Sequence, residues 1–261
     1  MASTLPLTQV EAELRRKVAV SCRIIGNRGI TRGTLGHVST RIPGTDRILI
    51  KAKGADEEAL EFTNERDVIA INIAGEVLEA PDGLAMPQET AMHLAVYRKR
   101  PEVESVIHAH PDWVVILTSA GKPIVPMVAA YDGNASLRLL DEGVPIYPRS
   151  MTITNDELGT DFMNTMGDHR ACILFGHGIT AAGSSVEDVT NTCLTLYEIA
   201  RLNYLTYAIG TPKAVADEDR QEINNRAAGG RYQGRHTSRS GEPSFWRYER
   251  RSLPPVPEGG N

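Results

Sequence analysis

The chain has 261 residues and a net charge of −5 at pH 7, with 41% hydrophobic and 23% charged residues. This composition is typical of a globular protein with enough chain for a large core, and the negative charge gives no support to a nucleic-acid-binding role. The sequence has no apolar run of the roughly 20 residues that span a bilayer and no signal-peptide pattern, so we expect neither a membrane partner nor secretion.

Predicted helices alternate with short strands over most of the chain. Apolar residues spaced three or four apart predict helices, and short β-branched runs between Gly and Pro predict strands. In chain order the predicted elements are a helix at 8–28, strands at 36–44 and 46–53, a strand-turn-strand segment at 67–79, a helix from 87 to 100, a strand at 103–107, a helix at 112–120, strands at 124–129 and 144–147, a helix at 156–167, a strand at 171–175 and a helix at 185–209. This alternation predicts an α/β fold with a mixed sheet.

The C-terminal region differs in composition from the rest of the chain. Between Arg226 and Arg251 there are seven arginines and only two acidic residues. One interpretation is a solvated tail, and the other is a tail anchored on a subunit, its own or a neighbouring one, by Phe245 and Trp246, with arginines left to meet an anion or a partner. We therefore divide the chain into a catalytic domain, 1–215, and an arginine-rich extension, 216–261.

Histidines carry the strongest functional signal in the sequence. His108 and His110 end a predicted strand, where side chains two residues apart point the same way, so both rings can reach one ion. His177 ends another predicted strand between two glycines, which leave the backbone room to turn. Glu89 begins a helix, where the helix dipole favours an anion, and His93 one turn later is expected to pack or hydrogen-bond. Three imidazoles with open positions are typical of a catalytic metal site, and packed histidines are the alternative.

These motifs resemble the class II aldolase/adducin family over roughly residues 10–210. The resemblance rests on G-H-V-S-T-R at 36–41, E-T-A-M-H-L-A-V-Y-R-K-R-P at 89–101, V-I-H-A-H-P at 106–111 and F-G-H-G at 175–178. It implies a three-layer α/β/α sandwich with a mixed, largely antiparallel central sheet, and a homotetramer with active sites at subunit interfaces. It also implies that one divalent metal ion per subunit binds His108, His110 and His177, and that Glu89 is the acid/base carboxylate.

Departures from the sugar-phosphate members of that family indicate a different substrate. Their G-N-x-S asparagine is His37 here, their phosphate-binding T-P-S-G segment is Lys51-Ala-Lys53-Gly54, and their serine pair before the glutamate is Pro87-Gln88. Pro126 stands where the aldolase has a proton-donating tyrosine, with Tyr131 as the nearest substitute. The chain is therefore more similar to the decarboxylases of the family, which act on hydroxylated aromatic or pyridine dicarboxylates.

The leading hypothesis is a metal-dependent decarboxylase of a hydroxylated aromatic or heteroaromatic carboxylate, in which Mn, Zn, Co or Fe stabilises an enolate or phenolate. Either Glu89 or His37 would protonate the ring carbon. The candidate substrate-binding residues are Ser39, Lys53, Gly54 and Tyr131. The main alternative is a class II aldolase with a non-phosphorylated substrate. A non-haem iron oxygenase and a non-catalytic, adducin-like interaction module are weaker alternatives.

Three cysteines, Cys22, Cys172 and Cys193, lie far apart in the sequence. They have neither metal-binding nor redox spacing, and this pattern is typical of reduced thiols in a cytoplasmic protein. We expect a cytoplasmic homo-oligomer that acts on a small-molecule carboxylate.

Overall fold

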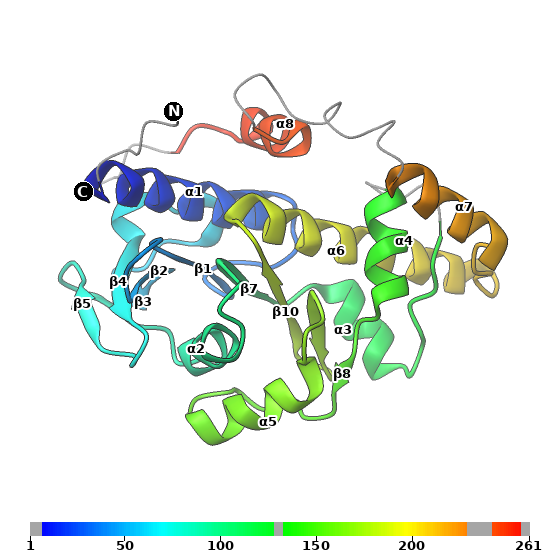
Figure 1. Ribbon diagram of the computed structural model, residues 1–261, viewed down its shortest axis with the longest axis horizontal. Helices are drawn as coiled ribbons and strands as arrows, with labels where there is room; N and C mark the ends of the chain where they lie inside the picture. Colours follow the sequence, from blue (N-terminus) through cyan, green and yellow to red (C-terminus); the bar gives the residue numbers. More distant parts are fainter. Residues whose placement is uncertain (1–6, 128–132, 229–241, 257–261) are drawn as a thin grey trace.

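The structure is a computed structural model that describes residues 7–127, 133–228 and 242–256 (Figure 1). Within those residues, one sheet of eight strands runs in the order β5-β4-β2-β1-β7-β10-β9-β8, and β3 and β6 form a separate pair. The strands are β1 (His37–Arg41), β2 (Arg47–Lys51), β3 (Lys53–Gly54), β4 (Val68–Asn72), β5 (Val77–Glu79), β6 (Leu84–Ala85), β7 (Ser105–Ala109), β8 (Ile146–Tyr147), β9 (Ala171–Leu174) and β10 (Gly178–Gly183). Neighbouring strands are antiparallel except for β8 and β9, which are parallel, so the sheet is mixed and largely antiparallel as predicted.

Helices cover both faces of the sheet. The helices are α1 (Leu7–Asn27), α2 (Thr90–Lys99), α3 (Asp112–Ser119), α4 (Gly133–Glu142), α5 (Asp156–Met166), α6 (Val186–Ile209), α7 (Asp217–Ala228) and α8 (Ser244–Ser252), with short 3-10 turns η1 (Leu60–Phe62) and η2 (Glu65–Asp67). Figure 1 shows α1 and α6 on one face and α2 and α5 on the other. Among the described residues, no helix is both long and apolar enough to cross a bilayer.

Alternating strand residues build one core on each face. In β2, Leu49 packs in the core under α1 and α6, whereas Ile48 and Ile50 pack in the core against α2 and α5. Successive strand residues point to opposite faces, so a strand that is apolar at every position fills two cores at once. This arrangement confirms the three-layer α/β/α sandwich.

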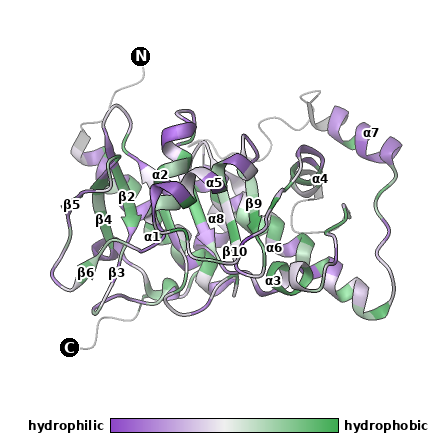
Figure 2. Ribbon diagram, turned by 90° about the horizontal axis from the view of Figure 1, so that it is seen from below, coloured by the Kyte–Doolittle hydropathy of each residue, from purple (hydrophilic) through white to green (hydrophobic). Residues whose placement is uncertain are grey.

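The C-terminal helices occupy different environments. Helix α7 is mostly hydrophilic and lies at the end of the molecule (Figure 2). Helix α8 returns over α1 (Figure 1), and its Trp246 is 3% exposed within the core of the same chain. Glu249 of α8 lies 3.8 Å from the Arg28 Nε atom. Trp246 therefore anchors this segment on its own chain.

Most predicted elements are present in the structure. One predicted strand is wrong, and several observed elements were not predicted. The predicted strand at 124–129 is wrong over its described residues, because the Asn203 side chain accepts a hydrogen bond from Val125 N and donates one to Val125 O. Those side-chain bonds replace the strand partner, and residues 128–129 lie outside the described residues. Helices α4, α7 and α8 and strands β6 and β10 have no counterpart among the predicted elements.

Candidate metal centre

Two neighbouring strands place the first pair of histidines on one face of the sheet. In the antiparallel register of β1 and β7, His37 lies directly opposite His108, and their ring centroids are 5.4 Å apart. Val38 and Ile107, the adjacent residues, belong to the core under α1 and α6. Side chains alternate along a strand, so both histidines point to the opposite face, which α2 covers.

The other two histidines come from the end of β7 and from the turn between β9 and β10. His110 follows β7 directly, and its Nε2 atom lies 2.7 Å from His108 Nε2. The His177 ring centroid is 4.8 Å from that of His110. A Cβ atom at Gly178 would lie 2.3 Å from the Ala109 carbonyl oxygen, so only glycine lets this turn approach the end of β7.

Glu89 completes the cluster from the start of α2. Its Oε2 atom lies 3.2 Å from His108 Nε2, and its Oε1 atom lies 3.5 Å from His177 Nε2. The candidate ligand atoms of Glu89, His108, His110 and His177 all lie within 4.8 Å of one another. Residues that are widely separated in sequence therefore present four donor groups to one point.

The donor atoms of this cluster suit a cation. His108 Nδ1 lies 3.0 Å from the Ile179 carbonyl oxygen, which accepts a hydrogen bond only from a protonated nitrogen. A hydrogen on Nδ1 leaves the Nε2 atom to face the cluster, as in metal-binding histidines whose other ring nitrogen donates to a backbone carbonyl. Glu89 Oε1 is buried and has no hydrogen-bond partner. A divalent metal ion would bind both the carboxylate oxygen that lacks a partner and the imidazole lone pairs beside it.

Burial keeps the surrounding imidazoles neutral. Desolvation and the neighbouring histidines lower the pKa of His110 to about 3, and they lower the pKa of His177 below its ordinary value. The pKa of His37 is lowered well below its ordinary value by the same causes. Metal ions bind the neutral form of imidazole, so these shifts favour the protonation state that binding requires at His110 and His177.

A buried chain of hydrogen bonds lies behind His37. His37 Nδ1 is 2.8 Å from His93 Nε2, His93 Nδ1 is 2.7 Å from Ser39 Oγ, and Ser39 Oγ is 2.7 Å from the Tyr97 hydroxyl. His93 and Ser39 have no exposed surface. The prediction that His93 packs and hydrogen-bonds is confirmed. Sequence reasoning missed Tyr97, although Glu89, His93 and Tyr97 recur every four residues on one helix face.

The predicted substrate-binding residues have different surroundings. Ser39 is fully buried, and both hydrogen bonds of its hydroxyl go to His93 and Tyr97, so it supports His37 from behind. Lys53 Nζ lies 3.4 Å from Glu57 Oε2 and interacts electrostatically with Glu89. Gly54 is an exposed residue with φ of +143° that pairs closely with β6. Tyr131 lies outside the described residues.

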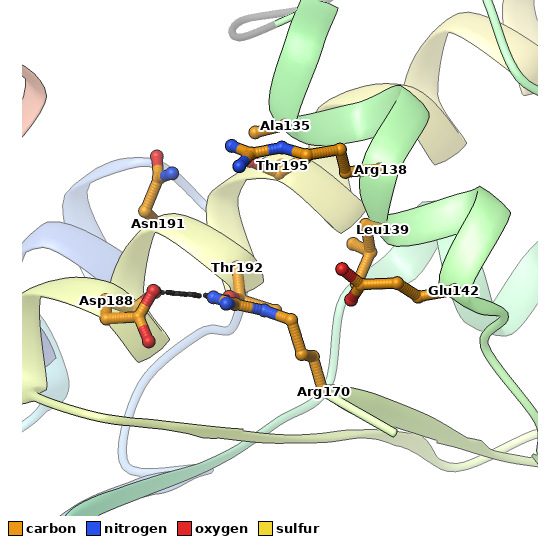
Figure 3. Close-up of a pocket in the computed structure, with 9 residues that line it drawn as sticks. All are labelled: Ala135, Arg138, Leu139, Glu142, Arg170, Asp188, Asn191, Thr192 and Thr195. Atoms are coloured by element: carbon orange, nitrogen blue, oxygen red, sulfur yellow. Dashed lines mark hydrogen bonds and ion pairs between the residues drawn. The ribbon is translucent and has the colours of Figure 1, made fainter. Parts of the chain in front are cut away.

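A separate cavity of about 170 Å³ lies between α4 and α6 at the other end of β9 (Figure 3). Its walls contain none of the clustered histidines. Arg170 crosses it to reach Asp188 Oδ1 at 2.5 Å and also donates to Thr192 Oγ1 at 2.8 Å. These contacts compensate the Arg170 charge within the protein, so the histidine cluster is the stronger functional candidate.

Known proteins resemble the chain in sequence and in fold. Residues 16–204 match the family model of the class II aldolase and adducin N-terminal domain. A 3,4-dihydroxyphthalate decarboxylase of Arthrobacter keyseri is 36% identical over 222 residues, which cover 84% of this chain and 88% of the relative. A 3,4-dihydroxyphthalate decarboxylase of Rhodococcus jostii is 33% identical over 215 residues, covering 81% of this chain and 88% of the relative.

Solved structures agree on the fold. An aldolase II superfamily protein from Pseudomonas syringae matches with a TM-score of 0.78 at 19% identity, covering 96% of this chain and 94% of that chain. An L-fuculose 1-phosphate aldolase from Glaciozyma antarctica matches with a TM-score of 0.73 at 18% identity, covering 87% of this chain and 86% of that chain. At these identities the likeness concerns the scaffold alone.

Proposed function

Because the chain belongs to the class II aldolase and adducin family, we propose that it is a metal-dependent decarboxylase of a hydroxylated aromatic dicarboxylate, with 3,4-dihydroxyphthalate as the first candidate substrate. One observation carries the proposal. The donor atoms of Glu89, His108, His110 and His177 converge on one point, in a chain that is 36% identical to a 3,4-dihydroxyphthalate decarboxylase.

The three clustered histidines would hold the metal ion, with Glu89 beside them. When bound, a divalent ion supplies a Lewis acid that stabilises negative charge on an oxygen next to the breaking carbon–carbon bond. Imidazole ligands suit Mn, Zn, Co and Fe, and decarboxylation changes no oxidation state, so any of these ions would serve. The chain therefore supplies ligands for one divalent ion per subunit, His108, His110 and His177.

The reaction needs one proton at a defined position. The bond between the ring carbon and the carboxylate next to the hydroxyl breaks, CO2 leaves, the electron pair stays on the ring carbon, and a proton replaces the carboxylate. The Glu89 side chain is 12% exposed and lies between His108 and His177. Burial opposes its ionisation, but the hydrogen bond with His108 and the neighbouring imidazoles lower the pKa of Glu89 to about 2, so it is a carboxylate. It would take a proton from the substrate hydroxyl or from water and pass that proton to the ring carbon. We assign the second substrate carboxylate to the ammonium group of Lys53, and we assign Ser39 to the support of His37 rather than to substrate contact.

Product analysis of the metal-loaded protein tests the proposal. With 3,4-dihydroxyphthalate we expect one CO2 for each dihydroxybenzoate formed, without oxygen uptake. The matched variants are His108→Ala, which removes a ligand and should abolish turnover, and His169→Ala, which changes a histidine outside the cluster and should not. Release of an aldehyde from a non-phosphorylated aldol substrate in place of CO2 would establish the aldolase alternative, and oxygen consumption would establish an oxygenase.

We further propose a cytoplasmic homotetramer whose subunit interface borders the metal centre, with residues 1–215 as the catalytic domain and 216–261 as its extension. Membership of the family, matched over residues 16–204, implies such an assembly. Phe175, two residues before His177, and Met151 are each 41% exposed, which suits an apolar contact beside the cluster. Cys22, Cys172 and Cys193 are buried free thiols, as a reducing compartment allows. Light scattering of the full chain would measure the assembly.

A further inference from the structure

The hydrogen-bond chain behind His37 determines which of its ring nitrogens carries the hydrogen. We infer that Tyr97, Ser39 and His93 hold His37 as the neutral tautomer protonated on Nε2, so that His37 presents a hydrogen-bond donor to the substrate. His93, Ser39 and Tyr97 are then positioning residues. The tautomer follows from the contacts alone, whereas its effect on turnover rests on the proposed function.

Each of the three hydrogen bonds in this chain needs one hydrogen. The donors must all point the same way along the chain. Ser39 has a single hydroxyl hydrogen, and its oxygen is 2.7 Å from both His93 Nδ1 and the Tyr97 hydroxyl. If Ser39 donates to one of them, it must accept from the other. The direction of the entire chain therefore depends on the Tyr97 hydrogen.

The surroundings of Tyr97 decide that direction. Its side chain is 1% exposed, and in the described part of the chain the hydroxyl has no acceptor other than Ser39 Oγ. The backbone N–H of Val106 and the Arg41 guanidinium, which lies 4.7 Å from the ring centroid, both favour negative charge on the Tyr97 oxygen, and neither group is a hydrogen-bond acceptor. A buried hydroxyl hydrogen that pointed anywhere else would lack a partner, and an unsatisfied buried donor destabilises the fold. Tyr97 therefore donates to Ser39.

The remaining hydrogens follow from this first link. Ser39 donates to His93 Nδ1. His93 is completely buried, and desolvation lowers its pKa to about 3, so the ring is neutral and its one hydrogen lies on Nε2. His93 Nε2 donates to His37 Nδ1 across 2.8 Å. His37 Nδ1 accepts this hydrogen bond and so carries no hydrogen, which leaves the ring hydrogen on Nε2, the nitrogen that faces the cluster.

The tautomer assigns different tasks to His37 and Glu89. His37 Nε2 lies 4.0 Å from Glu89 Oε2, beyond hydrogen-bond distance, so the donor is free for a substrate oxygen. A neutral imidazole that gave up this hydrogen would become an anion inside a buried site. His37 is therefore suited to hold a substrate carboxylate or hydroxyl, and we assign the relay of the proton to the ring carbon to Glu89.

Nitrogen NMR of the full chain, labelled at histidine and loaded with diamagnetic zinc, tests the inference. The signals of His37, assigned by their loss in His37→Asn, should show a protonated Nε2 and an unprotonated Nδ1. Ser39→Ala removes the donor to His93 and should produce a second His37 population protonated on Nδ1. Tyr97→Phe removes the hydrogen that sets the direction of the chain and frees Ser39 to accept from His93 Nδ1, so it should also produce that second population. Tyr147→Phe is the matched control, because it removes a buried tyrosine hydroxyl that bonds to Asp161, and it should not change the His37 tautomer.

The outcomes separate this inference from the proposed function. A wild-type His37 protonated on Nδ1 overturns the inference, whatever the activity, and so does an unchanged tautomer in both Ser39→Ala and Tyr97→Phe. If the protein decarboxylates its substrate, Ser39→Ala should lower kcat/KM at least about tenfold while the bound metal is retained. If the NMR result is as expected but no CO2 is released, the proposed function fails and the tautomer stands.

Discussion

His37 and His108 face each other across two strands, and the partner of each Nδ1 atom gives the two rings different roles. The Ile179 carbonyl takes the hydrogen of His108 Nδ1, which leaves a lone pair for a metal ion. His93 lies against His37 Nδ1, and the chain behind it ends in a tyrosine hydroxyl. The same side chain is thus suited to metal ligation at one position and to hydrogen-bond donation at the other.

Glu89→Gln separates metal binding from proton transfer. The three histidines remain, so the bound metal should stay close to one ion per subunit. The amide cannot carry a proton, so kcat should fall by about 10²–10⁴-fold. Elemental analysis and steady-state kinetics measure the two effects, with Glu102→Gln as the control because Glu102 lies on the surface and pairs with Arg100. Unchanged turnover in Glu89→Gln would show that another group delivers the proton.

At the scale of elements, periodicity predicted the parts of the fold that have a regular pattern. The helices predicted at 8–28 and 185–209 are α1 and α6, because their apolar faces repeat at helical spacing. Strand β10 was missed because Gly178–Gly183 consists mainly of small residues, which have weak β propensity. It forms a strand because it lies between β7 and β9, where both of its edges are paired.

In the candidate site, too, only the part that depends on local sequence patterns was predictable. Spacing within one strand brought His108 and His110 together, and the turn glycines pointed to His177, so the clustered histidines required only local reasoning. The support of His37 depends on the register of β1 against β7 and on the packing of α2 over β1, which places Ser39 against His93 and Tyr97. Tertiary packing determines such contacts, and one sequence does not reveal it.

Helix α8 offers a test of how the C-terminal segment is held. Trp246 is 3% exposed and packs in the core of the same chain, so Trp246→Ala should lower the free energy of unfolding by about 3–5 kcal/mol. Tyr248, on the same helix, is 59% exposed, and its replacement by alanine should change stability by less than about 0.5 kcal/mol. Urea unfolding measures both variants. Equal stability of wild type and Trp246→Ala would mean that α8 does not rest on this core in solution.

At the scale of the whole molecule, the metal centre joins elements that the chain connects only through long segments. Its candidate ligands come from the start of α2, from β7 and the residue after it, and from the turn between β9 and β10. An ion bound there stabilises only the folded state, because the unfolded chain does not bring these residues together. Metal binding should therefore raise the stability of the complete sandwich by linkage.

Removal of the metal should consequently lower the melting temperature. A free ion concentration 100 times the dissociation constant stabilises the fold by about 2.7 kcal/mol, which corresponds to roughly 5–10 °C for a chain of this size. Calorimetry with and without a chelator should show this shift in wild type. His108→Ala should melt near the chelated wild type, without responding to the chelator, because the sheet that carries the site is packed on both faces. A chelator shift of the same size in His108→Ala would place the stabilising ion outside the histidine cluster.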